Sequence, residues 1–285
     1  MVVFASVATS GKINHVTIKD CQPLPRIDDS LAALSGCRWL STCDLKSGYW
    51  QVSVAKEDKH KTAFAIEGGG FWQFKVMPFG LCNSGATFER LMEKVSAGLS
   101  WKICLLYLDD IIIFSKTFDE HMDHIDQVFN RLGEANLKLS PKKCHLLRKE
   151  VTFLGHTVSE NGIATDEEKI KAVKDWPIPK NVKQVRSRVG LCSYYRKFVP
   201  KFASIAKPLH KLTELNTKFI WDEICQMSFD TLKQALISSP VLAFPREEGL
   251  FIIDADASQY GMGSVLSQIQ DGVEQVISVL HAIIN

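Results

Sequence analysis

Two adjacent aspartates set between two apolar runs constrain the fold of this chain more than any other feature. Residues 105–108 and 111–114 are mostly aliphatic and aromatic, and Asp109 and Asp110 lie between them. Short apolar runs of this kind are typical of buried strands, so the sequence predicts a hairpin with an acidic tip. Two neighbouring carboxylates repel each other unless a cation compensates them. A divalent metal ion would do so; a surface hairpin without a metal is the alternative.

A third aspartate falls at the end of another predicted strand. Residues 39–45 have the pattern of a strand that presents Asp44 near its end. If Asp44 joins Asp109 and Asp110, three hard oxygen ligands converge, and they suit Mg²⁺ that keeps water and substrate phosphates in its other positions. Two such ions about 3.5–4 Å apart can activate a 3′-hydroxyl and hold a leaving pyrophosphate. That is the chemistry of a nucleotide polymerase.

The rest of the chain predicts a mixture of strands and helices. Glycines within residues 67–70 predict a hairpin of residues 62–66 with 71–76. Amphipathic periodicity predicts helices over residues 86–99 and 118–132. Further strands are predicted at residues 51–54, in a strand pair at 151–158 with a turn at Asn161-Gly162, and at 250–256 and 261–267.

Length and composition exclude several classes of protein. The chain has 285 residues, 46% hydrophobic and 23% charged, which suits about two folded domains and not a disordered, collagen-like or coiled-coil chain. No run approaches the ~18 apolar residues of a membrane helix. The apolar start of the chain lacks the basic residues that open a secretory signal. We therefore expect a cytoplasmic protein without a membrane span.

The net charge of +2 conceals a strongly basic middle segment. Residues 166–218 hold 13 Lys and Arg against 5 Asp and Glu, a net charge of +8, whereas residues 219–285 hold 2 against 9, a net charge of −7. Tyr194, Tyr195, Phe198 and Phe202 are interleaved with the bases of the middle segment. Cations beside aromatic rings suit a nucleic-acid groove. A solvated helix face whose rings point into a core explains the same pattern.

A series of blocks, in the same order along the chain, resembles the reverse transcriptases of gypsy-type LTR-retrotransposon Pol polyproteins. Tyr107-Leu108-Asp109-Asp110 is similar to the reverse transcriptase signature, and residues 43–49 are similar to the family's first catalytic motif, Leu-Asp-Leu-Arg-Ser-Gly-Tyr. The other similar blocks are residues 17–20 with 23–29, 61–64, 77–81 with 86–88, 153–156, 176–179 and 194–200.

The resemblance implies an α+β fold, a right-hand polymerase whose palm is a split β-α-β sheet. Partial fingers and the palm would occupy residues 1–160, a thumb and connection residues 161–218, and a truncated ribonuclease H-like segment residues 219–285. Asp44, Asp109 and Asp110 would bind two Mg²⁺ ions, with Mn²⁺ as a substitute, and catalyse nucleotidyl transfer. The implied partners are deoxynucleoside triphosphates, an RNA or DNA template and a DNA primer.

The resemblance also implies roles for residues outside the aspartates. Tyr49 would stack under the incoming sugar and exclude a 2′-hydroxyl, and Phe79 and Gly80 would line the nucleotide pocket. Packing in a core is the alternative for Tyr49, and structural packing with a turn glycine is the alternative for Phe79 and Gly80. The implied contacts to the primer and to nucleic acid are Phe153, Leu154, Gly155, Arg186, Arg188, Arg196 and Lys197. For the first three of these, structural packing with a turn glycine is again the alternative.

The end of the chain resembles the opening of the ribonuclease H domain that is tethered to these polymerases. Residues 255–258 match its first catalytic motif, with Asp256 as the first metal ligand. That fold takes further carboxylates from later elements, and the chain stops before they occur. We therefore expect no ribonuclease H activity from this chain alone.

Two functions follow from the sequence. The first is an RNA-directed DNA polymerase of a retrotransposon, located in the cytoplasm or in a retrotransposon particle, with other Pol segments as partners. The second is a catalytically inactive remnant that still binds nucleic acid. In the family a basic fingers segment precedes residue 17, whereas residues 1–16 offer only Lys12, Asn14 and His15. This favours the remnant, and the complete set of three aspartates opposes it.

Overall fold

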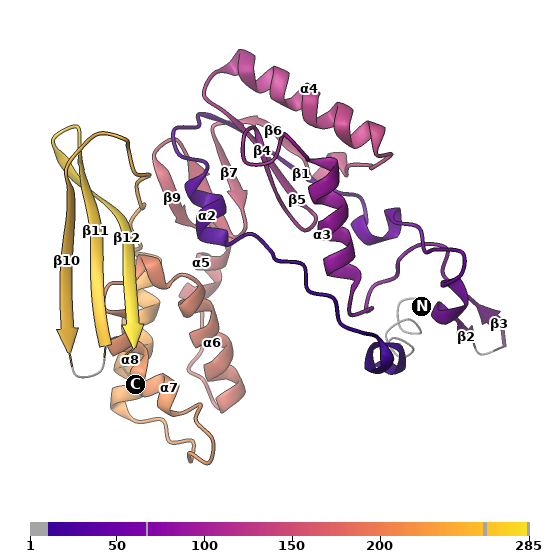
Figure 1. The fold of residues 1–285 in the computed structure, drawn as a ribbon. Helices are drawn as coiled ribbons and strands as arrows, with labels where there is room; N and C mark the ends of the chain where they lie inside the picture. Colours follow the sequence, from indigo (N-terminus) through magenta and orange to yellow (C-terminus); the bar gives the residue numbers. More distant parts are fainter. Residues whose placement is uncertain (1–10, 67, 259–260, 284–285) are drawn as a thin grey trace. The chain divides into compact units, whose positions relative to one another are not determined.

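The protein folds into two compact units, Met1–Val151 and Thr152–Asn285 (Figure 1). The structure is a computed structural model, and it describes residues 11–66, 68–258 and 261–283. Among these residues, none of the helices combines the length and the apolar character needed to cross a membrane.

A four-stranded antiparallel sheet forms the centre of the first unit. Its strands lie in the order β4 (Cys104–Tyr107), β5 (Asp110–Ser115), β1 (Trp39–Asp44) and β6 (His145–Arg148). The predicted acidic hairpin is confirmed, because β4 and β5 pair directly and Tyr107 faces Asp110 across the turn. Strand β1 lies between β5 and β6, so the sheet joins segments that are far apart in the sequence.

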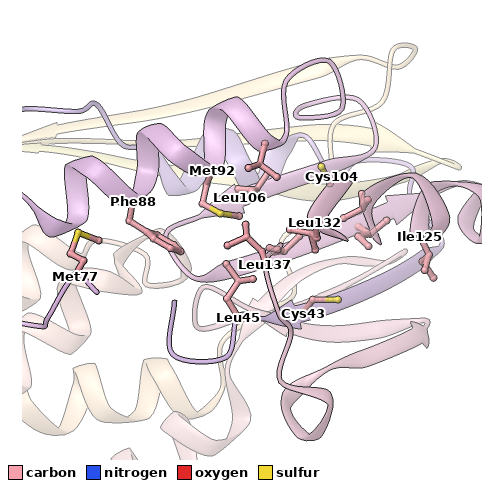
Figure 2. Close-up of a cluster of buried hydrophobic side chains, with 14 residues drawn as sticks. Cys43, Leu45, Met77, Phe88, Met92, Cys104, Leu106, Ile125, Leu132 and Leu137 are labelled. Carbon is pink, nitrogen blue, oxygen red and sulfur yellow. The ribbon is translucent and has the colours of Figure 1, made fainter. Parts of the chain in front are cut away.

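Two helices bury their apolar stripes in one hydrophobic cluster of this unit. The helices are α3 (Ser84–Val95) and α4 (Phe118–Glu134). Phe88 and Met92 on α3 are four residues apart, hence on one face of the helix, and both are fully buried (Figure 2). Ile125 and Leu132 on α4 join the same cluster, together with Leu106 from β4. The sheet and both helices are thus fixed to each other by a single core.

Short elements make up the rest of the first unit. They are α2 (Ile27–Ala32), the 3₁₀ helices η1 (Gly48–Gln51), η2 (Lys59–Thr62) and η3 (Pro141–Lys143), and the strands β2 (Phe64–Ile66) and β3 (Gly70–Trp72). The predicted hairpin at residues 62–76 is confirmed in a shorter form by the pairing of β2 with β3; residue 67 of its turn lies outside the described residues.

The strand predicted at residues 51–54 is wrong. Gln51 ends η1, and only Ser53 forms an isolated bridge, to Val76. Tyr49 and Val52 both pack against the core cluster. Side chains three residues apart share a side in a helical turn but not in a strand, so packing overrides the alternating pattern.

A small sheet lies at the start of the second unit, and its first strand crosses the boundary between the units at Val151. Strands β7 (Glu150–Phe153), β8 (His156–Ser159) and β9 (Gly162–Thr165) are adjacent in that order. The strand pair predicted at residues 151–158 is therefore confirmed, with its break at Leu154-Gly155, and Asn161-Gly162 turns the chain from β8 into β9.

Helices and a second sheet complete this unit. The helices are α5 (Glu167–Lys174), α6 (Val182–Tyr194), η4 (Arg196–Phe198), α7 (Phe202–Lys211) and α8 (Glu223–Ile237). Strands β10 (Phe251–Ser258), β11 (Gly261–Gln270) and β12 (Val273–Ile283) form an antiparallel sheet in that order. The strands predicted at residues 250–256 and 261–267 are confirmed, and β12 was not predicted.

Candidate active site

Asp44 and Asp110 lie directly opposite each other on neighbouring strands. They are Cα partners in the antiparallel ladder of β1 with β5. Opposite residues of such a ladder project from the same face, and successive residues of a strand alternate between faces. Cys43 and Ile111 belong to the core cluster beneath the helices. Asp44 and Asp110 therefore project from the other face of the sheet.

Asp109 lies in the tight turn that joins β4 to β5. The turn has two residues, and the first of them, Leu108, has a φ of 53°, a conformation that normally favours glycine. The carboxylate of Glu89 accepts a hydrogen bond from the Leu108 backbone N–H (3.2 Å), and Glu89 is only 2% exposed. Helix α3 thus holds the turn that carries Asp109.

Gly48 leaves the space that the Asp109 carboxylate fills. A Cβ atom at Gly48 would overlap Asp109 Oδ1 and would lie 2.9 Å from Cζ of Phe88. Only glycine fits at this position without a shift of one of these neighbours, so Gly48 fixes where the carboxylate of Asp109 can lie.

Burial and neighbouring negative charge disfavour the charged forms of Asp109 and Asp110. Burial raises the pKa of Asp109, and the charges of Asp44 and Asp110 raise it further. Burial and the charge of Asp44 likewise raise the pKa of Asp110. Lys143 opposes both shifts, and its Nζ lies 3.0 Å and 3.2 Å from the two carboxylate oxygens of Asp44. The site holds more negative charge than Lys143 alone neutralises.

The donor set has the chemistry of a divalent-cation site. Asp109 Oδ1 is buried and accepts no hydrogen bond from the described residues, and all the donors are hard carboxylate oxygens, which Mg²⁺ and Mn²⁺ prefer. Among the described residues, no three His, Cys, Asp or Glu side chains lie close enough together, as they are placed, to hold a metal ion. Lys143 contacts Asp44 instead.

Tyr49 and Phe79 form an aromatic group beside the aspartates. Their ring centroids are 5.2 Å apart, and Tyr49 also contacts Phe88 at 5.3 Å. Burial raises the pKa of Tyr49, with further contributions from the charges of Asp109 and Glu89. Phe79 is 47% exposed, so the group has one ring accessible to a ligand.

Gly80 is held by a residue from the start of the chain. Asn14 Nδ2 donates to the Gly80 carbonyl (2.7 Å), and Asn14 Oδ1 accepts from the Cys82 N–H (2.8 Å). Gly80 itself has a φ of 95°. Asn14 thus ties down the loop that follows Phe79.

The predicted primer contact is the turn between β7 and β8 in the second unit. Phe153 is buried at the end of β7. Leu154 and Gly155 form the turn, with φ values of 45° and 65°.

The four predicted nucleic-acid-binding bases differ in their surroundings. Arg186 and Arg196 are exposed, and Arg186 Nη2 donates to the Thr213 carbonyl (2.9 Å). The Arg188 guanidinium lies over the Trp176 ring (4.8 Å), and Lys197 Nζ lies over the Phe198 ring (5.5 Å). Arg186 and Arg196 are therefore the pair most open to an anionic partner.

Most of the aromatic rings in the basic segment belong to a core. Tyr195, Phe198 and Phe202 are at most 5% exposed, whereas Tyr194 is 38% exposed. Their use as stacking surfaces for bases, one of the two interpretations of this pattern, is thus wrong for the three buried rings. Burial of these three rings stabilises the helices that carry them, and this packing accounts for the spacing of the rings in the sequence.

Asp256 lies on β10, where it is the Cα partner of Gly263 on β11. Its side chain is 78% exposed, and its Oδ2 lies 3.9 Å from Nζ of Lys201. Such an exposed pair contributes little to stability, so Asp256 remains accessible.

Lys143 and Glu89 are site residues that the sequence analysis missed. Lys143 ends η3 and meets Asp44 because the Ser140 N–H donates to the Asp44 carbonyl (2.8 Å) and because β6, which follows η3, pairs with β1. No local pattern reveals these long-range contacts. Glu89 did carry a signal, since it is a charged residue beside Phe88 on the apolar face of a helix. A buried acid in such a place needs a partner, here the Leu108 N–H.

Comparison with known protein families gives two matches along the chain. A model of reverse transcriptase (RNA-dependent DNA polymerase) matches residues 7–158, and a model of the RNase H-like domain found in reverse transcriptase matches residues 221–281. The first match covers more than half of the chain and includes all three aspartates.

The curated relatives agree with these matches. The retrovirus-related Pol polyproteins from transposons 297 and gypsy of Drosophila melanogaster are 42% and 38% identical to this chain over 258 and 271 residues. Each alignment covers 90% of this chain but only 24% and 26% of the respective polyprotein, so the chain spans about a quarter of their length.

A foamy viral protease–reverse transcriptase solved in complex with double-stranded DNA has a TM-score of 0.85 and 26% identity to this chain, covering 97% of it and 48% of that protein. A second foamy viral structure, in complex with an RNA/DNA hybrid, has a TM-score of 0.81 and the same identity, covering 96% of this chain and 37% of that one.

Reverse transcriptases generally depend on divalent metal ions, which accords with the donor set of Asp44, Asp109 and Asp110. The match of the family model over more than half of the chain, together with the aspartates on their paired strands, shows that the chain belongs to the reverse transcriptase (RNA-dependent DNA polymerase) family.

Proposed function

We propose that this chain is an RNA-directed DNA polymerase, which extends a DNA primer with deoxynucleoside triphosphates on an RNA or DNA template. The observation that carries the proposal is the cluster of carboxylates on one hairpin and its neighbouring strand. Asp44 faces Asp110 across the ladder, and Asp109 lies in the adjoining turn with a buried oxygen that accepts no hydrogen bond from the described residues.

In this proposal Asp44, Asp109 and Asp110 hold two Mg²⁺ ions, with Mn²⁺ as a substitute. Bound metal would lower the pKa of the primer 3′-hydroxyl and stabilise the charge on the transferred phosphate. Lys143 must then release Asp44. Its side chain is 65% exposed, so it can turn into solvent without losing buried contacts. Gly48 and Glu89 keep Asp109 in place.

The remaining site residues receive substrate roles in the same proposal. Tyr49, Phe79 and Gly80 bind the incoming nucleotide, and Tyr49 excludes a 2′-hydroxyl. The turn of Phe153, Leu154 and Gly155 contacts the primer. Arg186, Arg188, Arg196 and Lys197 belong to the part of the chain that faces nucleic acid. The foamy viral relatives were solved with double-stranded DNA and with an RNA/DNA hybrid, which supports these partners.

The proposal also assigns regions and surroundings. Residues 1–160 form the fingers and palm, residues 161–218 the thumb and connection, and residues 219–285 the ribonuclease H-like part. The protein acts in the cytoplasm or in a retrotransposon particle, and other Pol segments are its partners, because the relatives are longer polyproteins.

The test is primer extension on poly(rA)/oligo(dT) with Mg²⁺ or Mn²⁺. We expect extension by the parent chain and its loss in Asp109→Asn, which keeps the size of the side chain but removes its charge. Asp123→Asn is the matched control, because Asp123 is an exposed residue of α4. Extension that survives in Asp109→Asn would contradict the proposed site.

A catalytically inactive, nucleic-acid-binding remnant is the second candidate function. The contact of Lys143 with both oxygens of Asp44 favours it, because a resident cation competes with a metal ion. We would assign this function if the parent chain and Lys143→Met both bind duplex in a salt-sensitive way but neither extends a primer.

A further inference from the structure

Two cysteines from distant parts of the sequence meet in the central sheet of the first unit. Thr42 on β1 is the Cα partner of His145, the first residue of β6. In an antiparallel ladder, the residue after one partner faces the residue before the other, so Cys43 faces Cys144. Opposite residues of such a ladder have Cα atoms about 4.5–5.5 Å apart, and disulfides span about 4.4–6.8 Å. The backbone therefore brings this pair within reach of a disulfide bond.

The two side chains lie on the same face of the sheet. Cys43 is 2% exposed and belongs to the core cluster (Figure 2), and Cys144 packs against that cluster. Burial raises the pKa of Cys43 to about 12, and the charge and the hydrogen bond of the Cys144 thiol contribute to this rise. Both cysteines are free thiols. The pair is thus made of two neighbouring thiols that touch.

Cys144 is the accessible member of the pair. It lies between η3 and β6, is half-buried, and its Sγ donates a hydrogen bond to the Ser140 carbonyl (3.2 Å). Oxidation of a cysteine by a reagent in solution requires access to the sulfur atom. A small oxidant therefore reaches Cys144 first, and Cys43 waits behind it as the second thiol.

We propose that Cys43 and Cys144 are a redox-sensitive modification site, at which a small-molecule disulfide such as oxidised glutathione joins β1 covalently to the segment between η3 and β6. Disulfides in cytosolic proteins are usually transient and redox-sensing. The bond therefore forms under oxidising conditions and is reversed by thiols. The site goes beyond the proposed function, because nucleotidyl transfer uses no thiol.

The bond forms in two exchange steps. The Cys144 thiolate attacks one sulfur atom of oxidised glutathione, and one glutathione leaves as a thiolate that takes up the proton lost by Cys144. The Cys43 thiolate then attacks the Cys144 sulfur of the mixed disulfide. The second glutathione leaves with the proton of Cys43. Two electrons pass from the two cysteines to the glutathione disulfide, which is reduced to two thiols.

The neighbours of the two cysteines belong to the candidate active site. Asp44 follows Cys43, and Lys143 precedes Cys144 and lies 3.0 Å and 3.2 Å from the carboxylate oxygens of Asp44. The Ser140 N–H donates to the Asp44 carbonyl (2.8 Å). A covalent bond holds two sulfur atoms closer than two thiols can lie, so the end of β1 must shift relative to η3. Oxidation should therefore displace Asp44.

The first experiment asks whether the bond forms. The reduced protein is incubated with oxidised glutathione, its remaining thiols are alkylated, and it is digested with trypsin without reduction. Residues 39–46 and 144–148 are tryptic peptides with one cysteine each, so mass spectrometry identifies the joined pair directly. We expect the linked peptides, and their separation by dithiothreitol. Glutathione on Cys144 without linked peptides, or no reaction at either cysteine, would overturn the proposal.

Variants and an unfolded control test whether the fold prepares the pair. Cys144→Ala, at a half-buried position, and Cys43→Ala should both abolish the linked peptides. Cys104→Ala is the matched control and should keep them, because Cys104 is a buried residue of the same core cluster. In urea the linked peptides should form about tenfold more slowly or less, because the long intervening chain lowers the effective concentration of one thiol at the other. Equal rates in the folded and unfolded chain would contradict a prepared pair.

The displacement of Asp44 is measured without any substrate. The amide resonance of Ser140, which donates to the Asp44 carbonyl, should change its NMR chemical shift when the parent is oxidised. It should not change in Cys144→Ala treated in the same way. The amide of Ala65, on β2 in a separate sheet, is the internal control. An unmoved Ser140 resonance in the linked protein would show that the bond leaves Asp44 in place.

The effect on primer extension rests on the proposed function. The oxidised parent should extend a primer about 100-fold more slowly than the reduced parent, the usual result of a small misplacement of a reacting group. Dithiothreitol should restore the rate, and Cys144→Ala should be insensitive to oxidised glutathione. Extension at full rate by the linked protein would contradict an effect of the bond on the site. A reduced parent that extends no primer would overturn the proposed function, whereas the linked peptides and the Ser140 amide still decide this inference.

Discussion

Gly48 controls the position of Asp109 through the side chain that it lacks. A methyl group there would overlap Asp109 Oδ1 and approach Phe88, and Phe88 is fully buried and cannot yield easily. We expect Gly48→Ala to displace the carboxylate and to lower the rate of primer extension about 100-fold, the usual result of a small misplacement of a reacting group.

The control for this prediction is another glycine-to-alanine change in the same unit. Gly133 lies within α4, and a Cβ atom there would have nothing within 4 Å. Gly133→Ala should stabilise the protein by about 1 kcal/mol because alanine is the better helix former, and extension should continue at the parent rate. Equal rates in Gly48→Ala and the parent would show that the carboxylate tolerates the shift.

Tyr49 combines a packing contact with its proposed role in substrate selection. Its ring touches Phe79 and Phe88, so Tyr49→Ala removes packing as well as a barrier to a 2′-hydroxyl. We expect the ratio of kcat/KM for deoxynucleotides to that for ribonucleotides to fall by about 10- to 200-fold, the range for one lost steric contact. The ratio separates the two roles, because lost packing affects both substrates alike. Tyr49→Phe keeps the ring and should keep the ratio; an unchanged ratio in Tyr49→Ala would make Tyr49 a packing residue.

At the residue scale, the sequence could point to the aspartates but not to what surrounds them. Asp44, Asp109 and Asp110 stand at predicted strand ends, so their meeting follows from the strand pattern and the family resemblance. Lys143 contacts Asp44 because long-range hydrogen bonds bring η3 and β6 beside β1, and no local pattern reveals them. Gly48 lies in the motif of residues 43–49, but the physical need for glycine there, the close approach of Asp109 and Phe88, arises only from tertiary packing.

Helix α4 begins with a reciprocal pair of hydrogen bonds. The Thr117 hydroxyl accepts from the Glu120 N–H (3.3 Å), and the Glu120 carboxylate accepts from the Thr117 N–H (3.1 Å). We expect Thr117→Ala to lower the free energy of unfolding by about 1 kcal/mol, the usual value of such a cap. Urea unfolding measures this. Thr117→Ser keeps the hydroxyl and should unfold as the parent does; equal losses in both variants would assign the effect to the lost methyl group.

At the element scale, prediction succeeded where local pattern and packing agree. The hairpin of β4 and β5 carries its own signal, because both strands are apolar and the turn is acidic. Residues 51–54 alternate like a strand, but the packing of Tyr49 and Val52 against the core cluster makes the chain turn there instead. Strand β12 follows β11 through a long ladder that shifts register after Leu266, and its own sequence shows no clear alternation.

At the scale of the whole chain, family and partners follow from different kinds of signal. The order and spacing of the motifs identified the family, and the comparison confirmed it. The charge of +8 in residues 166–218 supported a nucleic-acid partner, although the buried rings of that segment serve the core. The net charge of a segment can be counted from its sequence because charged side chains lie mostly on the surface. Whether an aromatic ring points into the core or into solvent depends on tertiary packing.

A buried histidine links three elements of the first unit. His121 on α4 is fully buried. Its Nε2 lies 2.8 Å from the hydroxyl of Ser41 on β1, and its Nδ1 lies 2.9 Å from the hydroxyl of Ser115 on β5. Burial, with a smaller contribution from His124, lowers the pKa of His121 to about 4. The folded protein therefore keeps this ring neutral at physiological pH.

The stability of the protein should depend on pH through this residue. In the unfolded chain His121 has an ordinary pKa near 6.5, so below that pH the unfolded state binds a proton that the folded state accepts only near pH 4. The free energy of unfolding should then fall by roughly 3 kcal/mol as the pH decreases from 6.5 to 4. Urea unfolding at pH 7, 5.5 and 4.5 measures the slope. His121→Gln, which cannot titrate, should flatten it, and His145→Gln, at an exposed position, should not. A slope that persists unchanged in His121→Gln would assign the pH dependence to other groups.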